Sequence, residues 1–368
     1  MTIILFLIIL LVLVMVHEFG HFIVAKLCGM RVDEFGVGFP PTIWSKKWRG
    51  TEYKVNTLPL GGYVKIFGEN GSDDDNQAKL DPQAFGNRPK WQQISVLLAG
   101  VAMNWALAYI IFLSLALFTT QMASVDNPDY SGRLSDVRTE ILQVQDGSPA
   151  SNSGILAGDR IVSISSTAGA SLYSASATPN MMKDFLNLHA DSVTINYVRS
   201  GVPGTANMSA VDGIVNDKKA IGIYFDKVGD VHIGTMEAFA LAAAKTVETT
   251  RAVYTGTVEL FTNLFKGNTD MLHQVSGPIG IAKVVGDASH GGLARLLLVT
   301  ALLSVNLAVF NLLPFPALDG GRIIVVAIEA LTRRKVPAAA QAWINGIGFL
   351  ILIAIMIAVS VSDVMKLV

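Results

Sequence analysis

The chain has 368 residues, of which 51% are hydrophobic and only 15% are charged. A soluble globular protein carries roughly 25% charged residues, so this composition indicates a membrane protein. The formal net charge of −1 gives no reason to expect nucleic acid as a partner, and the single cysteine, Cys28, excludes an intrachain disulfide.

Four apolar windows reach the length of about 20 residues that is needed to cross the hydrocarbon core of a bilayer. They are Thr2–Ala25, Ile94–Phe118, Leu293–Leu313 and Ala342–Val361. Positive charges follow the first window and lie between the third and fourth, whereas none precedes the first. By the positive-inside rule, both termini and the long middle segment are predicted to be extracytoplasmic. Because no Ala-x-Ala-like site follows the first window (residues 1–25), it is predicted to be a retained span.

Residues 26–93 are predicted to form β-hairpins and a loop on the cytoplasmic side, before the second span at 94–120. Alternating stretches occur at Thr51–Asn56 and Gly62–Phe67, with a predicted turn at Leu58–Gly62 between them. The many aromatic residues of this region suit a membrane interface, so we expect the hairpins to approach the bilayer. An ordinary cytosolic loop is the alternative. The acidic stretch Gly68–Asp81 is predicted to be a solvated loop.

The segment 121–230 has a soluble composition and is predicted to be one small extracytoplasmic α+β domain. Strands are predicted at Glu140–Val144, Arg160–Ser165, Val193–Arg199 and Ala220–Phe225, and a helix at Met181–Leu188. Gly147–Ala150 followed by Gly154–Val162 resembles the helix-turn-strand signature of bacterial PDZ domains. Such domains bind extended peptides at a sheet edge but can equally act as a steric filter, and both roles stay open. Residues 231–292 are predicted to be a helical connector to the last two spans, in 293–368.

The first apolar run ends in His17-Glu18-Phe19-Gly20-His21. Two histidines four residues apart lie on one face of a helix, which lets both reach one Zn²⁺ with the glutamate beside them. A charged side chain at the bilayer centre costs about 2.5–3.5 kcal/mol, and a bound metal would compensate for such a cost. The alternative is that these polar residues only cap the helix at the interface. The spacing therefore predicts a hydrolytic metal site within a membrane span.

A catalytic zinc ion normally has three protein ligands, so a further residue is needed. Asp319 is the only carboxylate between residues 288 and 328, and it follows the third span. The prolines of Pro314–Pro316 would end a helix there, and Gly320–Gly321 would permit a turn that directs the carboxylate inward. Taken alone, Asp319 could instead cap the next helix.

Two motifs together carry a resemblance to a known family. His17–His21 on the first apolar helix and the later Asn311…Pro314-x-Pro316…Leu318-Asp319-Gly320 resemble the site-2 protease family of intramembrane zinc metalloproteases. The PDZ-like insert is similar to that of the bacterial envelope-stress branch, which often carries two such domains. The resemblance implies a multi-pass α-helical membrane protein with four spans, a membrane-associated β-hairpin region and one extracytoplasmic PDZ-like domain.

The resemblance also implies roles for individual residues. His17, His21 and Asp319 would bind Zn²⁺, and Glu18 would be the general base. The residues that would hold the substrate are Asn306, Asn311 and Asn104. Buried amides in apolar helices could instead tie helices together. Val101 replaces the proline of the family motif that carries the last of these asparagines.

The activity implied by the resemblance is zinc-dependent hydrolysis of peptide bonds within transmembrane segments of single-span proteins. Anti-sigma factors and remnant signal peptides in the bacterial cytoplasmic (inner) membrane are the expected substrates. Because backbone carbonyls in a helix are already hydrogen-bonded, the substrate must unwind, and we expect it to pair with the strand-like residues of Gly36–Phe67. A metal transporter and a non-catalytic scaffold displaying a PDZ domain are alternatives. The former would show repeated polar helices, which we do not find, and the latter would not need Glu18.

Overall fold

The fold is described from a computed structural model for residues 2–69, 81–145, 147–167, 169–189, 192–199, 201–215, 218–266 and 277–365. The predicted solvated loop Gly68–Asp81 lies almost entirely outside these residues. The chain divides into two compact units, which are described separately below. One consists of Met1–Phe118 and Thr235–Val368, and the other of Thr119–Gly234.

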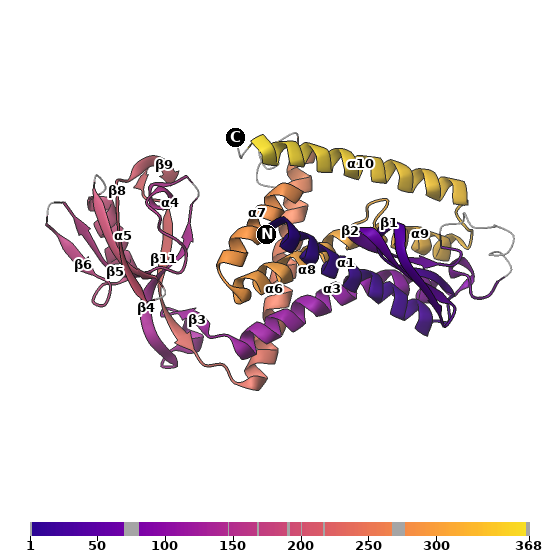
Figure 1. The fold of residues 1–368 in the computed structure, drawn as a ribbon, viewed down its shortest axis with the longest axis horizontal. Coiled ribbons are helices and arrows are strands. Elements are labelled where there is room, and N and C mark those ends of the chain that lie inside the picture. Colours follow the sequence, from indigo (N-terminus) through magenta and orange to yellow (C-terminus); the bar gives the residue numbers. More distant parts are fainter. Residues whose placement is uncertain are drawn as a thin grey trace. The chain divides into compact units, whose positions relative to one another are not determined.

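The first unit is mainly helical (Figure 1). Its helices are α1 (Thr2–Leu27), α3 (Lys90–Phe118), α6 (Thr235–Phe265), α7 (Pro278–His290), α8 (Leu293–Leu312), α9 (Asp319–Thr332) and α10 (Ala338–Met365), with a short 3₁₀ turn η1 (Phe85–Asn87). Among the described residues, α1, α3, α8 and α10 are long and apolar enough to cross a membrane. These helices agree with the four predicted spans, although α3 begins at Lys90 rather than Ile94.

Helix α3 packs against α1, α6 and α8 and so holds the first unit together. Small residues make this close packing possible, since Ala108 of α3 and Ala301 of α8 lie in one buried cluster with Val305. Helix α10 is the least covered of the spans. It is joined to α7 by the Asp363 carboxylate, whose Oδ2 accepts a hydrogen bond from Gly280 N–H at 2.8 Å.

Between α1 and α3 lie two long antiparallel strands, β1 (Val32–Trp48) and β2 (Thr51–Ile66). Each strand pairs twice with its partner, because Phe35 lies opposite both Tyr53 and Val64. The pairing therefore orders the sheet as four segments, 62–66, 32–37, 51–56 and 42–48, with 62–66 and 42–48 at its two edges. The prediction of a β-rich region after the first span is confirmed.

The predicted turn at Leu58–Gly62 is wrong. These residues stay extended within β2, and Leu58 pairs with Phe39 of β1. The stretches on either side of the predicted turn do not pair with each other. They lie on opposite sides of the segment 32–37, so the chain between them must pass the end of that segment rather than reverse tightly.

The second unit is an α+β arrangement around a seven-stranded sheet of order β3-β11-β4-β5-β7-β8, with β6 beside β5. The strands of this sheet are β3 (Gln121–Ser124), β4 (Leu134–Val144), β5 (Arg160–Ser166), β6 (Ser171–Tyr173), β7 (Val193–Arg199), β8 (Val202–Met208) and β11 (Ile223–Val231). The remaining elements are the strand pair β9 (Val211–Val215) and β10 (Lys218–Ala220), the helices α4 (Pro149–Asn152) and α5 (Pro179–Leu188), and the 3₁₀ turn η2 (Pro128–Tyr130).

Apolar residues of this sheet form the core of the second unit, where Ile161, Ile164 and Ile195 are buried in one cluster with Met182 of α5. The predicted helix and the first three predicted strands are present. The run Ala220–Phe225 instead spans the end of β10 and the start of β11. The PDZ-like character of this unit stays a prediction.

Candidate metal centre

The two histidines of α1 meet at one point of the helix surface. Their side chains leave α1 one turn apart, and the two Nε2 atoms lie 3.1 Å from each other. Both residues are buried, each with 6% of its surface exposed. The four-residue spacing therefore brings two imidazole nitrogens together between packed apolar helices, as the binding of one metal ion by both would require.

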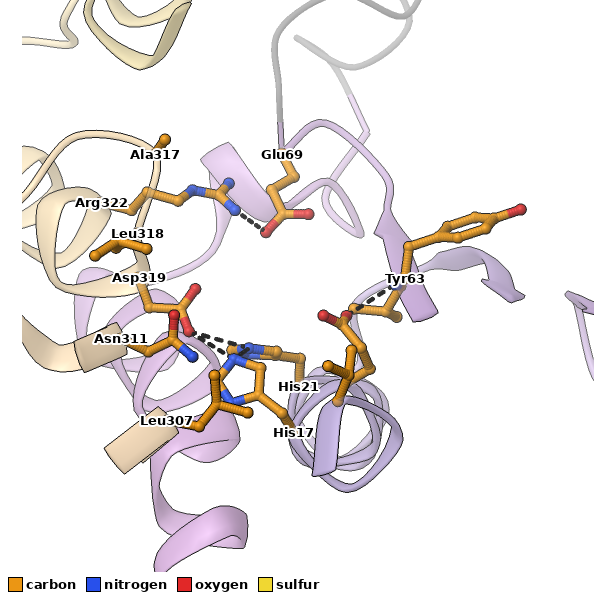
Figure 2. Close-up of a pocket in the computed structure, with 13 residues that line it drawn as sticks. His17, His21, Tyr63, Glu69, Leu307, Asn311, Ala317, Leu318, Asp319 and Arg322 are labelled. Carbon is orange, nitrogen blue, oxygen red and sulfur yellow. Dashed lines mark hydrogen bonds and ion pairs between the residues drawn. The ribbon is translucent and has the colours of Figure 1, made fainter. Parts of the chain in front are cut away.

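Asp319 reaches the histidines because α8 ends at Leu312 and the chain changes direction before α9. Leu313 precedes a proline, which disfavours helical backbone, and it is extended with ψ 144°. Helix α9 then begins at Asp319, whose Oδ2 lies 3.0 Å from His17 Nε2 and 3.3 Å from His21 Nε2 (Figure 2). Leu318 holds the N-cap position of α9, so the alternative of a capping Asp319 does not describe this carboxylate.

The predicted role of Gly320–Gly321 in the turn before Asp319 is wrong, whereas α8 does end just before Pro314. Among the described residues between α8 and α9, the left-handed backbone belongs to Ala317, with φ 72°, whereas Gly320 is helical. Gly320 is needed for a different reason. A Cβ at this position would collide with the backbone oxygens of Leu312 and Leu313. The glycine thus lets the start of α9 fold closely onto the end of α8.

The three donor atoms fit a zinc ion. Two ligands about 2.0–2.1 Å from one tetrahedral ion lie roughly 3.3–3.4 Å apart, and the observed separations of 3.0–3.3 Å are close to this. Two imidazoles and a carboxylate are also ligands that zinc accepts. Space for the histidines comes from Gly100 of α3, since a Cβ there would lie 2.8 Å from His17 Nε2 and closer still to His21.

Helix α3 also orients both rings from behind. His21 Nδ1 lies 2.7 Å from the carbonyl oxygen of Val96, so an Nδ1–H can donate to it and leave Nε2 free as a ligand. His17 Nδ1 lies 3.3 Å from Nδ2 of Asn104, whose buried Oδ1 has no hydrogen-bond partner among the described residues. The amide oxygen and nitrogen are nearly indistinguishable, and exchanging them places Oδ1 as the acceptor of a His17 Nδ1–H, which leaves His17 Nε2 free as a ligand.

Glu18 projects beside the donor cluster into a cavity of about 330 Å³. The cavity is lined by Val14, His17, Glu18, His21, Tyr63, Val64, Glu69, Leu307, Asn311, Ala317, Leu318, Asp319 and Arg322. One Glu18 oxygen accepts a hydrogen bond from Val64 N–H at 3.0 Å, on the sheet edge 62–66. The candidate general base therefore lies between the donor cluster and a strand edge.

This strand edge is stabilised by charges within the sheet. The Tyr63 phenol points away from the histidines (Figure 2) and donates to the Glu34 carboxylate at 3.1 Å. Burial raises the pKa of this phenol, so it remains a neutral donor. Lys54 lies 2.7 Å from the same carboxylate and holds the pKa of Glu34 below its usual value.

The three predicted substrate-holding asparagines lie in different places. Asn311 lines the cavity. Asn306 donates its amide to the Leu302 carbonyl at 3.0 Å, one turn back in α8, and is not among the lining residues. Asn104 lies behind His17, away from the cavity. The structure thus brings one of the three asparagines to the cavity.

Two charged lining residues were missed by the sequence analysis. Arg322 and Glu69 form an ion pair with 2.7 Å between Nη1 and Oε1. Arg322 follows Asp319 by three residues, and this helical spacing places both on one face, so it was open to prediction. Glu69 lies beyond the end of a strand, and its sequence neighbourhood carries no comparable signal.

Comparisons with known proteins bear on this arrangement. The chain matches the model of peptidase family M50 over residues 5–355. It belongs to this family. It is 32% identical over 353 residues to a protein of Clostridium perfringens named "Putative zinc metalloprotease", covering 96% of this chain and 95% of the relative. Proteins of the same description from Fusobacterium nucleatum and Nostoc sp. are each 31% identical. These cover 100% and 98% of this chain and 99% and 94% of their own length.

The protein is therefore a multi-pass membrane zinc metalloprotease of the site-2 protease family. The family resemblance stated from the two motifs is confirmed by the match, which includes both of them. Membership favours the peptidase over the transporter and the scaffold.

Proposed function

We propose that this protein is an intramembrane zinc endopeptidase that hydrolyses a peptide bond within the transmembrane segment of single-span membrane proteins. One observation carries the proposal. His17, His21 and Asp319 converge at a cavity lined by residues of α1 and α8, which are long enough to span a membrane, together with residues of β2 and α9. On this proposal these three residues hold the zinc ion.

The chain's own residues divide the chemistry among them. A zinc ion held there would polarise the scissile carbonyl and lower the pKa of the attacking water. Glu18 lines the same cavity, and as general base it would accept the proton of that water and later return it to the leaving amine. The amide of Asn311 also lines the cavity and would hydrogen-bond to the substrate backbone.

The sheet edge 62–66 is where an extended substrate would pair with the protein. Val64 N–H donates to the Glu18 carboxylate rather than to the neighbouring segment 32–37, so a substrate carbonyl can replace Glu18 as acceptor without breaking a hydrogen bond of the sheet. A substrate strand that added to this edge would supply a carbonyl oxygen to Val64. Pairing of this kind would also satisfy the backbone groups that unwinding a helix leaves exposed within the membrane.

Substrate class and cellular location follow from the family resemblance. Anti-sigma factors and remnant signal peptides in a bacterial cytoplasmic membrane are the proposed substrates, with both chain termini and the PDZ-like unit on the extracytoplasmic side. The PDZ-like unit, Thr119–Gly234, would bind an extended peptide or exclude substrates whose extracytoplasmic part is still large. A prior cut by another protease would remove that part.

A single substitution tests the function. Purified Glu18→Gln protein should cut a detergent-solubilised single-span substrate roughly 10²–10⁴-fold more slowly than wild type, the typical contribution of a general acid-base group, while retaining its zinc. Glu248→Gln, which changes an exposed carboxylate on α6, is the matched control and should cut normally. Cleavage by Glu18→Gln at the wild-type rate would refute the proposal.

A further inference from the structure

The cavity is crossed by one ion pair that the proposed chemistry does not use. Arg322 Nη1 lies 2.7 Å from Glu69 Oε1, and the two side chains are 25% and 10% exposed. Both residues line the cavity, and Figure 2 shows the guanidinium and the carboxylate meeting across it.

The ion pair joins the two walls that carry the proposed chemistry. Arg322 belongs to α9, three residues after Asp319, and its backbone N–H donates to the Leu318 carbonyl at 3.2 Å. Glu69 follows the end of β2 by three residues, and its N–H donates to the Ile66 carbonyl at 3.3 Å. Both partners therefore extend from anchored backbone. The contact ties the metal-ligand wall to the wall that ends the sheet edge 62–66.

The position of this tie conflicts with an extended substrate. A strand that paired with residues 62–66 would continue at about 3.3 Å per residue past Ile66, towards the position of Glu69. The ion pair spans the same cavity that Tyr63 and Val64 of this edge line, so a strand seated there would meet it. A cavity of about 330 Å³ is also at the lower end of the range for small-molecule sites, roughly 300–1,000 Å³, so it is small for a peptide strand.

We propose that the Arg322–Glu69 ion pair is a strap that closes the active-site cavity and must part before a substrate strand can seat beside the sheet edge. This inference rests on the proposed peptidase function. When the strap opens, a backbone carbonyl of the seated strand can accept from Arg322 in place of Glu69, so the cation does not lose all its hydrogen bonds. The strap thus couples opening of the cavity to occupation by substrate.

Covalent bridging of the strap provides the test. Cys28 is the only cysteine, so Cys28→Ser gives a background in which Glu69→Cys and Arg322→Cys introduce the only two thiols. A bifunctional methanethiosulfonate with a spacer matching the two lost side chains would lock the cavity reversibly. The bridged full-length enzyme should cut the single-span substrate at least tenfold more slowly than the same protein after reduction.

A matched control comes from α6. Lys245→Cys with Glu248→Cys, in the same background, replaces an exposed ion pair that does not line the cavity, and bridging it should not change cleavage. Equal cleavage by the bridged and reduced strap variants would overturn the proposal. If wild-type enzyme itself failed to cut, the proposed function would fail, and the metal measurement below would still test the strap.

Metal release gives a second readout that needs no activity. Glu69→Gln should lose zinc to a water-soluble chelator several-fold faster than wild type, because the strap no longer closes the cavity. The charge-exchanged variant, Glu69→Arg with Arg322→Glu, should return the rate towards that of wild type. Identical rates of zinc loss in wild type and Glu69→Gln would overturn the strap, whether or not the thiol variants fold.

Discussion

At the scale of residues, the metal centre depends on groups of α3 that have no reactive chemistry of their own. Gly100 leaves room for both imidazoles, the Val96 carbonyl receives His21, and Asn104 lies against His17. Partners of this kind fix the tautomer of a ligating histidine, and removing one typically weakens metal binding 10–100-fold. Because Asn104 contacts His17 and does not line the cavity, we propose that it positions His17.

Replacement of Asn104 tests this role. Asn104→Leu removes the acceptor for the His17 Nδ1–H, and we expect zinc affinity, measured by competition with a chelator, to fall about 10–100-fold. Asn104→Asp keeps an acceptor next to the ring and should retain most of the affinity. Asn306→Leu is the control, because that amide bonds to the backbone of its own helix and should leave zinc affinity unchanged. Undiminished zinc affinity in Asn104→Leu would exclude the positioning role.

The sequence predicted the parts of the centre that are local. His17 and His21 are one helical turn apart, so their convergence depends only on α1 forming. Asp319 was identified because so few carboxylates occupy the last spans. The contact of Asn104 with His17 and that of Arg322 with Glu69 join residues 87 and 253 positions apart by number, and such contacts depend on how the elements pack.

At the scale of elements, the edge 62–66 is the feature that relates the sheet to the metal centre. Within β2, Val64 directs its N–H towards α1 and Glu18, so this group takes no part in the ladder with β1. Proline is tolerated in a strand where the lost N–H faces away from the ladder. Proline at position 64 would therefore remove the Val64 N–H without removing a hydrogen bond between β1 and β2.

Val64→Pro uses this geometry. The variant keeps the ladder with β1 but loses the outward N–H and its hydrogen bond to Glu18. We expect the KM for the single-span substrate to rise several-fold, in addition to any change in kcat from the freed Glu18, while bound zinc is unchanged. Val64→Ala keeps the N–H and removes most of the side chain, and its KM should stay near that of wild type. If both variants raised KM equally, the side chain and not strand pairing would be responsible.

The spanning helices were predictable and the pairing of β1 with β2 was not, for a physical reason. Each spanning helix satisfies its own backbone and shows itself as one apolar window, so its position follows from local composition. The register of β1 and β2 depends on pairing between segments. Phe35 lies between Tyr53 and Val64, and nothing in the order of the residues specifies that double pairing. The predicted turn at Leu58–Gly62 failed for this reason.

At the scale of the whole molecule, the chain separates the candidate chemistry from its insert. All three candidate ligands and Glu18 belong to the unit that contains the spanning helices, and none lies in Thr119–Gly234. The change in composition near residues 121 and 230 predicted an insert with similar limits. Within the insert, Gln121 of β3 lies directly opposite Val231 of β11. Its two ends therefore leave the sheet side by side, about 5 Å apart as paired strands require.

This closeness of the two ends predicts that the insert can be removed. Replacing Thr119–Gly234 by a short Gly/Ser linker should leave bound zinc at the wild-type stoichiometry, measured by atomic absorption on the purified protein, because every candidate ligand remains. If the unit excludes large substrates, the shortened enzyme should also cut a single-span substrate that still carries a folded extracytoplasmic domain, which wild type should cut at least tenfold more slowly. The shortened enzyme that also carries Asp319→Ala serves as the control with reduced zinc. Loss of zinc on excision alone would show that the insert is required to form the metal centre, contrary to this division of the molecule.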